Sequence, residues 1–136
     1  MDIQKIAIGT IVGGIVLFLA GWVIWGTGLE GFLADNMVNH SGLMKERELG
    51  LTAASCMVSA LLLSIIYNRW AGIKTPKTGA IAGAVILSLV GFAADLGIMS
   101  SMNLINSTVV LTDIVANGLW GAIGGAAIGW LLGRGN

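Results

Sequence analysis

Four long apolar stretches dominate the chain, and short polar segments separate them. They cover residues 6–25, 49–67, 79–101 and 111–132, and only Asp95 and Asp113 place a charge inside them. An α-helix needs roughly 20 apolar residues to cross about 30 Å of hydrocarbon. Backbone groups inside lipid must find hydrogen bonds within their own segment, which favours helices. The pattern therefore predicts an all-α, polytopic membrane protein whose four transmembrane helices form a single domain, residues 1–136.

The composition supports this interpretation. Of the 136 residues, 56% are hydrophobic and 10% are charged, whereas a soluble domain has about 25% charged residues. Seven basic and seven acidic residues cancel, so we expect the lipid bilayer and no nucleic acid as a partner. The first apolar stretch is too long for a signal-peptide core and lacks a small-residue cleavage site after it. We expect it to be a retained helix.

The positive charges predict the orientation of the helices. Five of the seven lie at the amino end, in the 68–78 connection or at the carboxyl end, namely Lys5, Arg69, Lys74, Lys77 and Arg134. Only Lys45 and Arg47 lie in the other connections. Cytoplasmic connections carry an excess of Lys and Arg, so this asymmetry predicts that both termini are cytoplasmic. Tyr67 and Trp70 would then lie in the aromatic belt at the cytoplasmic interface.

The longest connection, residues 26–48, has apolar residues at helical spacing. Leu29, Phe32, Leu33 and Met37 recur with polar residues between them. This pattern is typical of an amphipathic helix that lies in a membrane interface. We expect residues 26–48 to form an outer interfacial segment.

Helix four carries a row of glycines at a spacing of four residues, namely Gly121, Gly125, Gly129 and Gly133. Apolar side chains do not drive helices together in lipid, so helices associate where small residues let their backbones approach. The row predicts a helix-packing interface. The partner helix could belong to this chain or to a second protomer.

Polar residues inside the predicted spans gather in the outer half of the membrane. Helix two begins with Thr52, Ser55 and Cys56, and helix four begins with Asp113 and Asn117. Asp95 lies in the last third of helix three. Trp22 and Trp25 end helix one. We expect these residues to form an outward-facing polar pocket that could hold a ligand or an ion, with Asp95, Asp113, Asn117, Thr52, Trp22 and Trp25 as its candidate residues.

Asp95 is the residue that most requires an explanation. An ionisable group in a span costs about 2.5–3.5 kcal/mol on insertion scales and often marks a transport path, a proton relay or a ligand site. The structural alternative is a protonated or hydrogen-bonded Asp95 that fixes helix register. Asp113 is nearer the interface and could be an ordinary anion at a helix N-terminus.

The sequence lacks the patterns of most enzymes. Asp95 and Asp113 raise the possibility of an intramembrane acid pair, but the Gly-x-Gly-Asp setting of intramembrane aspartyl proteases is missing around Asp95. The Cys and His residues lack zinc-ligand spacing, and no Ser, Lys or His combination resembles a nucleophile and base. We expect no enzymatic activity, no cofactor and no metal site.

The segment 21–26, Gly-Trp-Val-Ile-Trp-Gly, is followed by Phe32 and Asn36. This start resembles that of small four-helix bacterial membrane proteins grouped as a domain of unknown function. The resemblance covers the first 40 residues and the general helix layout, although the aromatic-Ser-Pro segment usual after the first helix is absent. It implies a bacterial inner membrane and no known activity.

Two functions are compatible with these patterns. The leading hypothesis is a non-enzymatic four-helix protein that acts in a homo-oligomer or as an accessory subunit of a larger membrane complex. The alternative is a small transporter or ligand-binding membrane protein that uses the outer pocket around Asp95.

Overall fold

The computed structural model describes residues 3–29, 49–101 and 105–134. Most of the predicted interfacial segment, including its amphipathic pattern from residue 30 onward, lies outside these residues. The described elements are helical, and four of them are long and apolar enough to cross a membrane. The all-α class and the presence of four such helices are confirmed.

The helix bounds differ by a few residues from the apolar stretches. Helix α1, Ile3–Gly21, continues into the wider π-helical coil η1, Trp22–Leu29. Helix α3, Leu49–Ile65, continues in the same way into η2, Ile66–Ala71. Helix α4 spans Pro76–Ser101 and α5 spans Ser107–Gly133.

Local signals set the starts of α4 and α5, and hydropathy alone does not show them. Pro76 opens α4, where its missing N–H costs nothing because that group would have no partner in the first turn. Asn106 precedes α5, and its side chain accepts a 3.0 Å hydrogen bond from the backbone N–H of Val109. These signals lie outside the apolar runs, so both helices start earlier than predicted.

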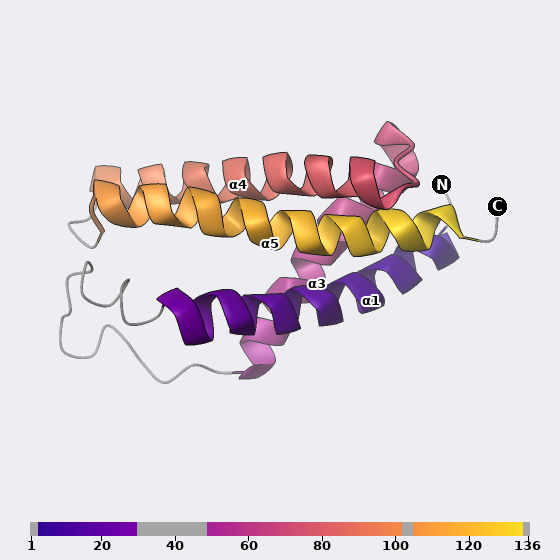
Figure 1. Cartoon of the computed structure of the whole chain (residues 1–136), viewed down its shortest axis with the longest axis horizontal. Coiled ribbons are helices and arrows are strands. Elements are labelled where there is room, and N and C mark those ends of the chain that lie inside the picture. The colour runs from indigo at the N-terminus through magenta and orange to yellow at the C-terminus, as the bar shows by residue number, and fades with distance from the viewer. Residues whose placement is uncertain (1–2, 30–48, 102–104, 135–136) are drawn as a thin grey trace.

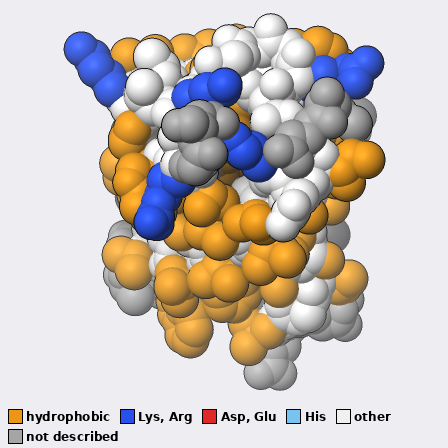
Figure 2. Space-filling view, turned by 90° about the vertical axis from the view of Figure 1, so that its right-hand side faces the viewer, with side chains coloured by type: hydrophobic (Ala, Val, Ile, Leu, Met, Phe, Trp, Pro, Cys, Tyr) orange, Lys and Arg blue, Asp and Glu red, His pale blue; other side chains and the backbone are white. Residues whose placement is uncertain are grey.

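The helices run alternately in opposite directions (Figure 1). The start of α1 and the end of α5 lie at the same end of the bundle, which also holds the connection between η2 and α4. Helices α4 and α5 lie side by side along their length, and α3 crosses them obliquely. Figure 2 shows that Lys and Arg side chains gather at the end with the termini. This is the only end of the bundle that carries Lys or Arg within the described residues.

The glycine row of α5 packs against α4 within the chain. A Cβ atom at Gly121 would meet the carbonyl oxygen of Gly83, and one at Gly125 would meet the carbonyl oxygen of Gly79. Gly129 and Gly133 face the backbone of Thr75 and Lys74 in the same manner. The two backbones therefore touch over about four turns of α5. Of the two partners that the sequence left open for this row, the structure places α4 of the same chain against it.

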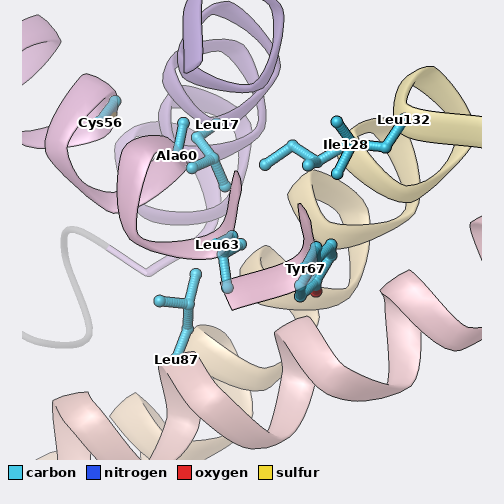
Figure 3. Packing of buried hydrophobic residues seen from close by; sticks show 8 residues of the cluster. All are labelled: Leu17, Cys56, Ala60, Leu63, Tyr67, Leu87, Ile128 and Leu132. Carbon is cyan, nitrogen blue, oxygen red and sulfur yellow. The ribbon is translucent and has the colours of Figure 1, made fainter. Parts of the chain in front are cut away.

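A cluster of buried hydrophobic residues from α1, α3, η2, α4 and α5 forms the core (Figure 3). Leu17, Leu63, Tyr67 and Ile128 are fully buried there, and Ile128 fills the space beside Gly13. Tyr67 differs from the sequence-based expectation of an aromatic side chain on the surface of the bundle, because it is 0% exposed. Tyr67 lies in η2, and its side chain points inward, where its hydroxyl group contacts α4. Trp70, three residues later, is exposed.

Candidate functional site

A cavity of about 660 Å³ lies between the end of α1 with η1, the start of α3, and α5. Pockets of about 300–1,000 Å³ are typical of sites for small molecules. The cavity is at the end of the bundle opposite the Lys and Arg side chains. Its lining combines aromatic, aliphatic and neutral polar residues: Phe18, Gly21, Trp22, Trp25, Leu49, Leu51, Thr52, Ser55, Cys56, Asn117 and Trp120.

One face of α1 and η1 forms the aromatic wall. Phe18, Gly21, Trp22 and Trp25 follow one another at spacings of three, one and three residues, which places them on the same side of a helix. The rings of Phe18 and Trp22 meet edge to face, with centroids 6.2 Å apart. Trp22 keeps 58% of its surface exposed. This wall therefore offers a partly open aromatic surface to the cavity.

Trp120 is held in place by α1. Its indole N–H donates a 2.8 Å hydrogen bond to the carbonyl oxygen of Leu17. Gly21 makes room for the ring, because a Cβ atom there would lie 3.3 Å from the indole nitrogen. Trp25 meets Trp120 edge to face with centroids 5.4 Å apart. The two indoles form a rigid corner, since one of them is fixed to the backbone of the neighbouring helix.

Asp95 and Asp113 lie together behind this corner. Their carboxyl groups lie close enough to interact with each other, and the side chain of Trp25 lies close to that of Asp113. Asp95 is 9% exposed, and its Oδ2 atom is buried with no hydrogen-bond partner among the described residues. Trp25 thus contacts both the cavity and the acid pair.

Asn117 provides a second connection between the acid pair and the cavity. It lines the cavity one helical turn beyond Asp113. Its side-chain amide rests on Gly91, where a Cβ atom would meet the amide nitrogen. Gly91 lies one turn before Asp95 on α4. The absence of a side chain at Gly91 therefore lets α4 and α5 approach where the two carboxyl groups meet.

The structure brings the six candidate residues of the sequence to one region, in two groups. Trp22, Trp25, Thr52 and Asn117 line the cavity, whereas Asp95 and Asp113 are absent from its lining and pair between α4 and α5. Asp113 differs from an ordinary anion at a helix N-terminus, because it lies beyond the first turn of α5 and close to Asp95.

Sequence reasoning missed part of the lining, notably Phe18, Leu49 and Leu51. A signal for Phe18 was available, because it continues the helical face of Trp22 and Trp25. No comparable signal marked Leu49 and Leu51, since leucines at the start of an apolar helix equally face lipid.

The site has the chemistry of a binding pocket for an amphipathic molecule. Indole and phenyl rings offer apolar area and bind cations through their faces. Thr52, Ser55 and Asn117 supply neutral hydrogen-bonding groups, and the carboxyl groups of Asp95 and Asp113 lie nearby. Comparison with family models, with curated proteins and with solved structures finds no match to this chain. The functional argument therefore stands on the site itself.

Proposed function

We propose that this protein is a small membrane protein that binds, and in an assembly could transport, an amphipathic ligand in its outer cavity. The observation that carries this proposal is the 660 Å³ cavity with three Trp side chains, next to the buried Asp95 and the half-buried Asp113. A purely structural bundle gains nothing from an open, tryptophan-lined cavity, because the lost packing contacts lower its stability. Ligand sites typically combine apolar walls with a few placed polar groups, as this one does.

The proposal includes the orientation and the location. The described Lys and Arg side chains gather at the end that carries both termini (Figure 2), and such residues are enriched on the cytoplasmic side. Both termini are then cytoplasmic and the cavity lies in the outer half of the membrane. The sequence resemblance makes the bacterial inner membrane the proposed location.

A second proposed function is that of a subunit in a homo-oligomer or a larger membrane complex. The packing of the inner half supports it, because Leu63, Tyr67, Ile128 and Leu132 are almost completely buried there. A path across one copy would have to disrupt this core, so transport would require more than one chain or a partner. The glycine row is covered by α4. We therefore place any contact with another subunit on a different surface.

Ligand binding can be tested with N-phenyl-1-naphthylamine, a neutral aromatic probe that fluoresces in apolar surroundings. Full-length protein in phosphatidylcholine nanodiscs would be titrated while energy transfer from Trp to the probe is recorded, with empty nanodiscs as the background. The Ser55→Phe variant should lower the affinity at least about tenfold, because the ring fills the cavity. Its control is Val58→Phe, at a position that is 66% exposed and outside the lining. Equal affinities of the two variants and the wild type would exclude the cavity as the site.

A further inference from the structure

We propose that the ligand of the cavity is a lipid-like amphiphile with a single hydrocarbon chain, whose uncharged head lies in the cavity while the chain lies in a groove between α1 and α3. The inference rests on the proposed ligand-binding function and names the chemical class of its ligand. Two observations carry it: an apolar groove that shares Phe18 with the cavity, and a closed core on the inner side of the cavity.

The groove is a hollow of about 260 Å³ where α1 packs against α3. Ile15 and Leu19 on its α1 wall are 54% and 56% exposed, and they lie in a helix that is long and apolar enough to cross a membrane. In a membrane, the groove would therefore open to the hydrocarbon. Its described lining is apolar throughout: Gly14, Ile15, Phe18, Leu19, Ala53 and Met57.

Phe18 lies at the junction of the cavity and the groove, because it lines both. The two hollows are also neighbours along α3. Thr52 and Cys56 line the cavity, and the residue that follows each of them, Ala53 or Met57, lines the groove. A hydrocarbon chain that leaves the cavity beside Phe18 would thus enter apolar space between the same two helices.

The core closes the inner side of the cavity. Leu17, Ala60 and Ile128 are fully buried there (Figure 3). Leu17 precedes Phe18 on α1, and Ala60 lies one turn beyond Cys56 on α3. A chain attached to a head in the cavity could extend inward only by disrupting this packing. The groove instead offers it an apolar path along the surface of the bundle.

Gly14 and Met57 give the groove a floor that can adapt to a chain. A Cβ atom at Gly14 would meet the sulfur of Met57, so the thioether rests on the backbone of α1. Methionine is unbranched and flexible, and it fills irregular apolar space. The side chain of Met57 can therefore shift against a bound chain while the two helices stay in place.

The cavity lining favours a head without charge. Thr52, Ser55 and Asn117 supply hydroxyl and amide groups, which can bond to the hydroxyl groups of a head. No residue of the described lining is charged, and Asp95 and Asp113 are not part of it. A charged head would leave water without a partner of opposite sign in this lining, which costs free energy.

The test uses monooleoylglycerol, which joins one long chain to an uncharged head with hydroxyl groups. Full-length protein in phosphatidylcholine nanodiscs would first bind N-phenyl-1-naphthylamine. The bilayer mole fraction of monooleoylglycerol that displaces half of this probe would then be measured, with protein-free nanodiscs as the background. Oleyl phosphate and oleyltrimethylammonium carry the same chain and opposite charges. Each should require a mole fraction at least about tenfold higher, because its charge lacks a partner in the lining.

Two variants fill the groove from its opposite walls, Ala53→Phe on α3 and Ile15→Phe on α1. Each should raise the half-displacing mole fraction at least about tenfold, because the blocked chain loses the burial of several methylene groups. The matched controls are Ala54→Phe and Ile11→Phe, at exposed positions outside both linings, and they should stay within about twofold of the wild type. All four variants should bind N-phenyl-1-naphthylamine itself within about twofold of the wild type, since this probe needs the cavity alone.

A measurement on the wild type complements these variants. A monoacylglycerol with a diazirine at the end of its chain should, on illumination, attach to the groove residues of α1 and α3. Excess monooleoylglycerol should suppress this labelling, which peptide mass spectrometry would locate. If the groove variants fail to fold, the labelling pattern decides.

Three results would overturn the lipid-like ligand: no displacement of the probe from the wild type, equal displacement from the groove variants and their controls, or suppressible labelling confined to α4 and α5. Equal or tighter binding of either charged analogue would overturn the uncharged head. Binding of the neutral probe with loss in Ser55→Phe would still support the cavity in each case. Absence of neutral-probe binding would remove the proposed function as well.

Discussion

The hydroxyl of Tyr67 donates a 2.6 Å hydrogen bond to the carbonyl oxygen of Gly79 and so joins η2 to the first turns of α4. The phenol occupies space that Gly125 leaves open, since a Cβ atom at Gly125 would lie 2.7 Å from the hydroxyl oxygen. Three helical segments therefore meet at one side chain. The close contact of α4 with α5 and the docking of α3 depend on the same small residues.

Replacement of Tyr67 by Phe should lower the free energy of unfolding by about 1 kcal/mol, because it removes one buried hydrogen bond and keeps the ring. Melting of the purified protein in mild detergent would measure the loss. Ser100→Ala is the control, since its exposed hydroxyl bonds within its own helix. A Tyr67→Phe protein that melts with the wild type would show that the bond does not hold α3 to α4.

Single methyl groups should discriminate between packed and open glycines. Gly83→Ala and Gly125→Ala each place a Cβ atom against a backbone carbonyl of the facing helix, and we expect each to cost about 1–3 kcal/mol. Gly97→Ala on α4 meets nothing within 4 Å and should be neutral or stabilising by up to about 1 kcal/mol. Denaturation in detergent would compare the three variants. Equal losses at Gly83 and Gly97 would show that close approach of the backbones is not what stabilises this pair of helices.

The four helices could be predicted from the sequence because lipid leaves a spanning backbone few other conformations. The inward turn of Tyr67 could not, because it depends on the π-helical coil of η2, and an aromatic residue at the end of an apolar stretch equally suits an interface. The candidate residues Asp95 and Asp113 were visible as charges in apolar stretches. Their pairing could not be predicted, because it depends on the register between α4 and α5 that Gly91 and Asn117 set through direct contact.

The Asp95→Asn and Asp95→Leu variants should differ in stability. Asparagine can still donate to and accept from Asp113, so we expect a free energy of unfolding within about 0.5 kcal/mol of the wild type. Leucine places an apolar side chain against the Asp113 carboxyl group between the helices, and we expect this to cost about 1–3 kcal/mol. Thermal unfolding in detergent would measure both. A Leu variant as stable as the wild type would mean that the pair does not contribute to the packing of α4 against α5.

The orientation of the bundle predicts the outcome of reporter fusions. A reporter that is active only in the cytoplasm should give full signal after Asn136 and in the turn at Gly72, since the end of α5 and the connection between η2 and α4 lie with the Lys and Arg side chains. The same reporter inserted at Asn39 should give none. Activity at Asn39 would reverse the orientation and place the cavity on the cytoplasmic side.

Two adjacent positions on α3 test whether the cavity is open to the outer solvent. Ser55 is exposed and lines the cavity, whereas Cys56 next to it is 6% exposed. In a Cys56→Ser background, Ser55→Cys should react with a membrane-impermeant thiol reagent added outside. Its rate should exceed that of the native Cys56 at least about tenfold, because a buried thiol is inert. Saturating N-phenyl-1-naphthylamine should slow the reaction at position 55 by occupying the same space.

If the reagent modifies position 55 from the inside only, the cavity does not face outward. If the probe gives no protection, the reactive thiol and the bound probe are in different places, and the ligand site must be sought outside this cavity.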